Sequence, residues 1–284
     1  MEKWSVHEED RPYIRSSRPF NPWIAVAAIG TIAWIAAFSY RYLLDQPHPA
    51  PPAETVAAPK TEAAAAPAPE PAVRHPLETP AESAASLPTL DNSDSMMRRA
   101  LAGLMGNKAF GELVVPDQLV RRIVATVDNL PRRTAPTRNM PLNAVPGAFA
   151  ILGGDDNATI GSANYERYLP YVRVIEMIEP HTLVYSYAQA YPLFQRAYEE
   201  LGYPGKYFND RLIEAIDDLL SAPQFDAPVR VLRSKVLYEF ADPSLETLSA
   251  GQKIMIRMGQ ENAARVKAKL WDVRRELIAA SRKP

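Results

Sequence analysis

The chain has 284 residues, nearly equal numbers of basic and acidic side chains, and a formal net charge of −1 at pH 7. General nucleic-acid-binding proteins normally carry a strong basic excess, so this balance argues against nucleic acid as a partner. Cysteine is absent, which excludes disulfides, thiol catalysis and cysteine-ligated metal sites.

An uncharged, apolar segment runs from Trp23 to Tyr40. As a helix it would be about 27 Å long, close to the hydrocarbon thickness of a bilayer. The segment is longer than the apolar core of a typical signal peptide, and no clear small-residue cleavage site follows it. We therefore predict a transmembrane signal anchor over residues 23–44, with the lipid bilayer as its partner.

Basic residues on the two sides of this span predict its orientation. Four precede it and one lies close behind it: Lys3, Arg11, Arg15 and Arg18 before, and Arg41 after. Basic residues are retained in the cytoplasm, so residues 1–22 are expected to form a cytoplasmic arm and the remainder to be exported.

Residues 45–88 are built mainly from proline, alanine and glutamate. Repeated proline removes backbone donors and favours polyproline II, so we predict a disordered linker without packed structure. Its fully extended length would be on the order of 130 Å. The linker either sets a working distance from the membrane or serves as a tether without a length requirement.

Residues 89–284 are long enough for one sizeable core, and their periodicity predicts a compact, mainly α-helical domain with one small β-hairpin. The first helix should start at Asp91 or Ser93 and end at Gly106. A second amphipathic helix should carry Pro116 in its first turn. The hairpin is expected around residues 153–157.

The middle of this domain is rich in tyrosine. One apolar helical stripe comprises Leu183, Tyr187, Tyr191, Phe194, Tyr198 and Leu201. Pro192 interrupts the stripe and should kink the helix or mark a break, and Pro170 interrupts the preceding helical segment. Asn209 is expected to cap the next helix.

Two segments remain near the C-terminus. Residues 228–243 show partial alternation with β-branched residues, which favours a strand, although a helix also fits. The last segment carries a short heptad pattern from Ala263 to Ala280. Sustained coiled coils are longer, so a helix docked on its own domain is preferred to a dimerisation helix, and the oligomeric state stays open.

No known catalytic motif occurs in the chain, and we predict no catalytic residues, no metal and no cofactor. His181 is the only histidine beyond residue 88 and falls at a predicted helix start, where a capping or exposed role is ordinary. The adjacent pairs Glu199–Glu200 and Asp217–Asp218 point about 100° apart on a helix, so neither pair converges as an acid and a base would.

Two turns carry the candidate interaction residues. The first turn leads into a helix and combines aromatic and charged groups: Tyr203, Lys206, Tyr207, Asp210 and Arg211. The second provides Tyr238 and Glu239. The alternative is structural, with a tight turn, a cap and an ion pair between Asp210 and a neighbouring arginine. Residues 128–133 are interpreted as a helix end with solvated charges.

Several blocks between residues 90 and 275 resemble the bacterial envelope family catalogued as a domain of unknown function, number 3014: AFGELVVPDQLVRRIVATVDNLPR, VPGAF, NYERYLPYV, YPLFQRAYEELGYPGKYFNDRLIEAIDDLL, KVLYEFADPSLETLSAGQKIMIRMG and ENAARVKAKL. The resemblance implies a bacterial protein with a single N-terminal membrane helix. It implies no activity and no catalytic residues.

These observations favour a non-enzymatic binding or scaffold protein. It would be anchored in the bacterial inner membrane and would present a periplasmic domain to an envelope protein or a cell-wall component. The second hypothesis is a carboxylate-dependent hydrolase of cell-wall glycan or peptide, with tyrosines as stacking surfaces. A cleft with two carboxylates about 5 to 10 Å apart, walled by tyrosines, would favour the hydrolase.

Overall fold

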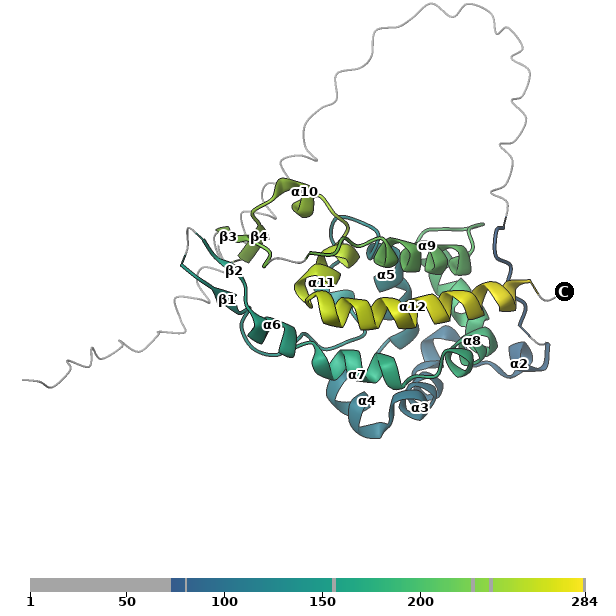
Figure 1. Cartoon of the computed structure of the whole chain (residues 1–284). Helices are drawn as coiled ribbons and strands as arrows, with labels where there is room; N and C mark the ends of the chain where they lie inside the picture. The colour runs from purple at the N-terminus through teal and green to yellow at the C-terminus, as the bar shows by residue number, and fades with distance from the viewer. Residues whose placement is uncertain (1–72, 80, 155–156, 226–227, 235–236, 283–284) are drawn as a thin grey trace, which may run out of the picture. The chain divides into compact units, whose positions relative to one another are not determined.

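The computed structural model describes residues 73–79, 81–154, 157–225, 228–234 and 237–282. This part of the chain is mainly helical, as predicted, with two small antiparallel hairpins (Figure 1). The predicted cytoplasmic arm 1–22, the membrane anchor 23–44 and the linker up to residue 72 lie outside the described residues. Within the described ranges, no helix combines the length and the apolar character needed to cross a membrane.

Eleven α-helices and two 3-10 turns are described. They are α2 (Ala81–Ser86), η1 (Leu90–Asn92), α3 (Asp94–Met105), α4 (Asn107–Leu113), α5 (Leu119–Asn129), η2 (Thr137–Asn139), α6 (Ser162–Glu166), α7 (Leu169–Met177), α8 (Pro180–Glu200), α9 (Phe208–Leu220), α10 (Pro243–Glu246), α11 (Ala250–Arg257) and α12 (Gln260–Ser281). The strands are β1 (Ile151–Leu152), β2 (Thr159–Ile160), β3 (Val231–Ser234) and β4 (Leu237–Phe240).

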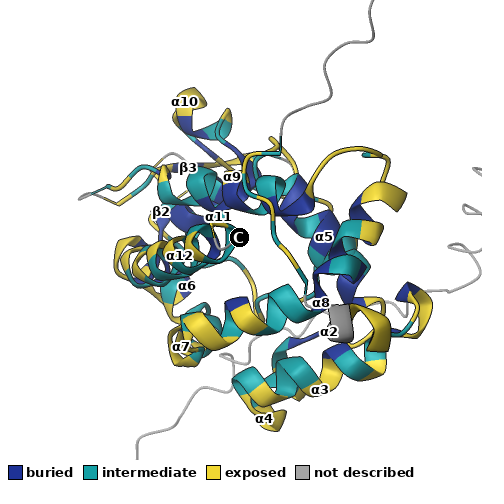
Figure 2. Cartoon of the chain, turned by 90° about the vertical axis from the view of Figure 1, so that its right-hand side faces the viewer, coloured by how far each residue is buried: buried dark blue, intermediate teal, exposed yellow. Residues whose placement is uncertain are grey.

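Helix α8 lies at the centre of the helical core and contacts α5, α9 and α12. Most of its tyrosine-rich stripe packs inside the core as the periodicity predicted, with Tyr191, Phe194 and Tyr198 buried. The last predicted member, Leu201, follows α8 and is exposed. Phe194 stacks on Phe208 of α9 with 5.9 Å between ring centroids. Figure 2 shows buried stretches on α5 and α9, whereas α3, α4 and α7 carry much of the exposed surface. Aromatic packing between α8 and α9 therefore positions the turn that joins them.

Three prolines test the predicted helix boundaries. Pro116 precedes α5, so its expected place in the first turn was wrong; the Asp94 carboxylate accepts the N–H groups of Gln118 and Leu119 and fixes the later start. Pro170 lies in the first turn of α7, after a break that separates α6 from α7. Pro192 lies inside α8, which continues without a break.

The carbonyl that Pro192 leaves without a helical partner is satisfied from another segment. Proline has no N–H, so the carbonyl of Ala188 loses its normal helical bond. The hydroxyl of Thr79 donates to this oxygen at 3.1 Å. Residue 79 falls in the range predicted as linker, so a defect in α8 provides a docking point for the N-terminal segment.

The described part of the predicted linker packs on the helical core. Leu77 and Leu87 contact the core cluster, and α2 packs against α8. Asn209, which is completely buried, donates from Nδ2 to the carbonyl of His75 and to the hydroxyl of Ser281. Asn209 lies inside α9, so its predicted capping role was wrong; Tyr207 occupies the cap position.

The C-terminal helix docks on its own domain, as predicted. Helix α12 contacts α7, α8 and α9, and it buries Val266 and Leu277 along the expected stripe. The guanidinium of Arg274 forms an ion pair with Asp217 of α9. Apolar packing therefore uses one face of α12, and charged pairs align its edges.

The hairpin predicted at residues 153–157 is present, with Ile151 opposite Ile160. The strand-or-helix segment forms a second hairpin, in which Val231 lies opposite Phe240. The two hairpins are joined where the N–H of Val231 donates to the carbonyl of Ala158 at 2.9 Å. The domain therefore has two hairpins where one was predicted. The second packs against the first, because Val231 and Phe240 share a buried cluster with Ile160.

Candidate functional site

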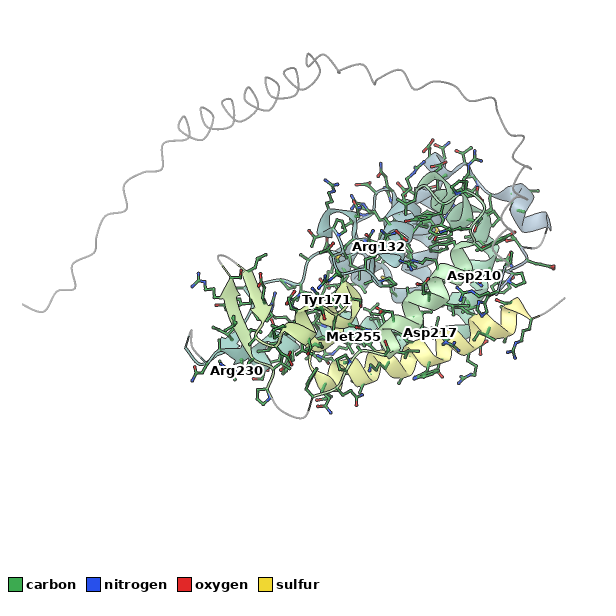
Figure 3. The ribbon with its side chains drawn as sticks, turned by 90° about the horizontal axis from the view of Figure 1, so that it is seen from above. Arg132, Tyr171, Asp210, Asp217, Arg230 and Met255 are labelled. Atoms are coloured by element: carbon green, nitrogen blue, oxygen red, sulfur yellow. The ribbon has the colours of Figure 1, made fainter. Side chains whose placement is uncertain are left out.

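Five of the seven predicted interaction residues line one pocket with a volume of about 410 Å³. It lies at the turn between α8 and α9, and the end of α5 and the N-terminal segment complete its wall. Its lining residues are Arg74, Asp128, Arg132, Tyr198, Tyr203, Lys206, Tyr207, Asp210, Arg211 and Glu214. Figure 3 labels Arg132 and Asp210 among them. We call this cavity the tyrosine pocket.

A buried carboxylate organises the tyrosine pocket. Asp128 is 4% exposed, and its side chain accepts hydrogen bonds from Arg132 at 2.8 Å and from Arg211 at 3.2 Å. The hydroxyl of Tyr203 lies 3.4 Å from the same carboxylate and also accepts from Arg132. The bond to Asp128 raises the pKa of the Arg132 guanidinium. This network joins α5, α9 and the turn before α9, so it gives the pocket a fixed wall.

The turn between α8 and α9 is held by one glutamine. The Gln195 side chain accepts from the N–H of Phe208 at 2.9 Å and donates to the carbonyl of Lys206 at 2.8 Å. Gly202 and Gly205 adopt positive φ angles of 112° and 77°, a conformation that L side chains rarely adopt. These contacts preorganise the predicted residues of the turn before any ligand binds.

Tyrosine rings form the second element of the pocket. Tyr198 and Tyr203 stack with 4.6 Å between centroids, and the Lys206 ammonium lies 5.4 Å from the Tyr203 ring. Tyr207 is 40% exposed. Burial raises the pKa of Tyr198 to about 12, and the nearby charge of Asp128 acts in the same direction. The pocket therefore combines a stacked tyrosine pair, an exposed tyrosine and a cation in one place.

Asp210 anchors the N-terminal segment at the pocket. Its carboxylate accepts the backbone N–H groups of Arg74 at 3.1 Å and His75 at 2.8 Å, and it contacts the His75 ring at 3.0 Å. The predicted alternative of an Asp210–arginine ion pair is not what the structure has, because Arg211 pairs with Asp128 and Glu214. The anchor brings the Arg74 side chain to the rim.

Charged groups in the pocket fall into two kinds. The carboxylates of Asp128 and Asp210 are fully engaged by protein donors. The side chains of Arg74 and Lys206 are exposed and form no ion pair with any described residue. The free charges of the pocket are therefore positive and lie beside the exposed Tyr207, an arrangement suited to an anionic group attached to an apolar or aromatic one.

The other two predicted interaction residues lie elsewhere. Tyr238 and Glu239 belong to β4 and do not line the tyrosine pocket. Tyr238 stacks on Phe149 with 5.4 Å between centroids, and Glu239 is exposed. Their role in an interaction stays a prediction.

Residues 128–133 were interpreted as a helix end with solvated charges. Helix α5 does end at Asn129, and Arg132 and Arg133 are exposed, but Asp128 is not solvated. Asp128 is buried because it follows Val120 and Val124 at intervals of four, on the stripe of α5 that faces the core. The sequence signal for this burial was a charged residue on an otherwise apolar helical stripe. Arg74 gave no such signal, since its position depends on contacts with α9 that are 136 residues away.

The remaining sequence candidates have structural positions. His181 is exposed in the first turn of α8, where its N–H donates to the capping Glu179 side chain. Glu200 pairs with Arg121, and Asp217 pairs with Arg274, so the adjacent carboxylates diverge. Across the described ranges, no cluster of three or more His, Asp and Glu side chains could hold a metal ion.

The structure defines the protein as a mainly helical domain with a preorganised polar pocket. The model of the family described as Protein of unknown function (DUF3014) matches residues 119–274, more than half of the chain. The chain therefore belongs to this family, and the predicted resemblance is confirmed. The matched range includes every lining residue of the tyrosine pocket except Arg74. The comparisons with curated proteins and with solved structures give no match.

Proposed function

We propose that this protein is a non-enzymatic binding module of the bacterial envelope, anchored in the inner membrane by residues 23–44. The uncharged span from Trp23 to Tyr40 and the basic residues before it support this topology. The helical domain would then lie in the periplasm, on a tether that extends to residue 72. Binding takes place at the tyrosine pocket.

The ligand that best fits this pocket is an acidic segment of another envelope protein. The observation that carries the proposal is the pairing of free cations, Arg74 and Lys206, with the exposed ring of Tyr207 on a preformed wall. Carboxylates of the partner would pair with the cations, and an apolar or aromatic side chain beside them would pack on the tyrosines. Because the wall is already ordered, binding costs little reorganisation.

The hydrolase hypothesis is less well supported by the same pocket. Asp128, Asp210 and Glu214 are gathered near tyrosines, as a glycosidase-like site would require. Asp128 and Asp210, however, each have both carboxylate oxygens bound by protein donors. Only Glu214 is half exposed, and it pairs with Arg211. A second free carboxylate for acid and base chemistry is missing from the pocket lining.

Site-specific photocrosslinking in cells tests the proposal. A photoreactive residue replaces Tyr207 in the full chain, and the crosslinked products are identified by mass spectrometry. The matched control carries the same residue at Tyr185, an exposed tyrosine on α8 outside the pocket. We expect Tyr207 alone to capture one defined protein, and the crosslinked peptide of that protein to be acidic.

A charge reversal tests whether capture of the partner depends on the charge of the pocket or only on closeness to position 207. Lys206→Glu should abolish most of the capture, whereas Lys108→Glu, the same change at an exposed position on α4, should leave it unchanged. Equal products from Tyr207 and Tyr185, or equal yields from both reversals, would contradict the proposal. Release of soluble fragments from isolated cell walls by the purified full chain would instead establish the hydrolase.

A further inference from the structure

A second pocket, with a volume of about 270 Å³, is lined by an excess of basic side chains. Its lining residues are Gln118, Arg121, Arg122, Ala125, Arg138, Asn139, Ala197, Glu200 and Leu201. Three arginines from α5 and η2 line it together with a single carboxylate, that of Glu200. We call this cavity the arginine pocket. Of its residues, the sequence singled out only Glu200 and Leu201, and neither as part of a binding site.

Two of the arginines are held in place by the surrounding structure. Arg121 donates to Glu200 at 3.0 Å and forms an ion pair with Asp91 at 2.8 Å. Arg122 donates from Nε to the carbonyl of Asp117 at 2.9 Å, and it also donates to the carbonyl of Arg138. Since Arg122 is bonded to carbonyls and not to carboxylates, its charge is not neutralised by these contacts.

The third arginine and two amides are available to a ligand. Arg138 is exposed, and its guanidinium makes no ion pair or hydrogen bond with the described residues. The side-chain amides of Gln118 and Asn139 also have no hydrogen-bond partner in the described ranges. The pocket therefore presents unpaired donors beside arginines that the surrounding structure holds in place.

The backbone at Gln118 is an independent observation at the same place. Gln118 has φ +53°, and it is the only non-glycine residue with positive φ among those described. An L residue adopts this left-handed conformation only at a cost in free energy, and such outliers cluster at ligand sites. Gln118 occupies the N-cap position of α5 in this conformation and lines the pocket.

We propose that the arginine pocket binds a phosphate group. Guanidinium forks pair with the oxygens of phosphate, and charge-assisted hydrogen bonds of this kind are among the strongest in proteins. The pocket lining places donors on α5, on η2 and at the turn before α5. A tetrahedral oxyanion can accept from several directions, whereas a planar carboxylate is matched by one fork. The site is separate from the tyrosine pocket and does not depend on the function proposed for it.

Calorimetric titration of the purified full chain with inorganic pyrophosphate tests this site. Arg138→Ala removes a free donor and should weaken binding about tenfold, because a hydrogen bond to a charged group is lost. The control Arg133→Ala removes the same charge from a nearby exposed arginine that does not line the pocket, and it should leave the affinity within about twofold. Circular dichroism checks that both variants are folded.

Competition then distinguishes the source of the phosphate. Displacement of pyrophosphate by a water-soluble, short-chain phosphatidic acid would assign a lipid headgroup as the ligand. Displacement by sugar phosphates alone would assign a soluble molecule. Absence of binding to pyrophosphate, or equal weakening by Arg138→Ala and Arg133→Ala, would overturn the proposal.

Discussion

The tyrosine pocket and the arginine pocket are built from neighbouring residues of the same two helices but use their charges differently. Asp128 and Tyr198 line the first, and Ala125 and Ala197 line the second. In the tyrosine pocket, Arg132 and Arg211 bind a buried carboxylate and serve as structure. In the arginine pocket the carboxylates are too few to neutralise the guanidinium groups. The difference shows that the partners of an arginine, more than its presence, indicate whether it can bind a ligand.

The largest expected effect comes from removing the buried carboxylate. Asp128→Ala removes the buried partner of Arg211, which is 15% exposed and keeps only the half-exposed Glu214 as an ion-pair partner. We expect a loss of about 3–5 kcal/mol in the free energy of unfolding, because a buried ion pair is broken. Urea denaturation of the full chain, followed by tryptophan fluorescence, measures this loss.

Asp117→Ala provides the control, because Asp117 pairs with Arg98 at the surface and its side chain is 71% exposed. This change should alter stability by less than about 0.5 kcal/mol. Equal losses of stability from the two substitutions would contradict a structural role for the Asp128 network.

The second prediction concerns alkaline pH. The pKa of Tyr198 in the folded protein is about 12, above its ordinary value of 10.0, because burial disfavours the phenolate. The folded state therefore holds this proton more tightly than the unfolded state. The stability that Tyr198 contributes is fully present below pH 10 and is lost as the pH rises towards 12.

Tyr198→Phe should reduce this alkaline loss and leave the stability at pH 7 nearly unchanged, since the Tyr198 hydroxyl makes no hydrogen bond with the described residues. Thermal unfolding from pH 8 to pH 11.5 measures the effect. Tyr191 also has a pKa of about 12 but bonds to Gln195. Tyr191→Phe should therefore lower stability at neutral pH as well, and identical pH profiles for the two variants would contradict this reasoning.

The third prediction tests how the N-terminal segment reaches the tyrosine pocket. Thr79→Val removes the donor to the carbonyl of Ala188 and should cost about 1 kcal/mol. In a Pro192→Ala background the new N–H can bond to Ala188, so the same substitution should cost less. A double-mutant cycle of unfolding free energies measures the difference. Additive costs would show that Thr79 does not compensate for Pro192.

The smallest expected effect is at the mouth of the arginine pocket. Gln118→Gly relieves the left-handed backbone of a non-glycine residue and should stabilise the domain by about 0.5 kcal/mol, after the entropy cost of glycine. The same variant should bind pyrophosphate more weakly. Opposite effects on stability and binding would mark Gln118 as a ligand residue, whereas a loss of stability would show that its backbone is not strained.

Residue patterns in the sequence predicted the local parts of this structure well. Periodicity identified α3, α8 and α12 and the docked face of α12, and the first hairpin lies where turn residues placed it. Five interaction candidates line one pocket because all of them belong to a single turn and the helix that follows it. Local sequence reasoning succeeds where the residues that meet are close in the chain.

Long-range contacts account for most of what the sequence did not show. Proline and alanine made residues 73–88 resemble a tether, but Asp210, Asn209 and the free carbonyl of Ala188 hold part of this segment on the core. The arginine pocket likewise combines α5 with η2 and α8, and the arginines of α5 look like an ordinary solvated face in the sequence. Composition predicts the conformation that a segment adopts in isolation. Contacts with residues far along the chain determine where the segment packs in the folded domain.

The two bonds made by Asn209 bring both ends of the described domain to one point. Its side-chain amide donates to the carbonyl of His75 and to the hydroxyl of Ser281, and Figure 1 shows the first described segment and the C-terminal end on the same side. Domains with adjacent termini tolerate circular permutation and insertion into host loops. A short peptide between residues 282 and 73 should therefore close this domain into a ring, and a new opening elsewhere would place the chain ends at another point of the fold.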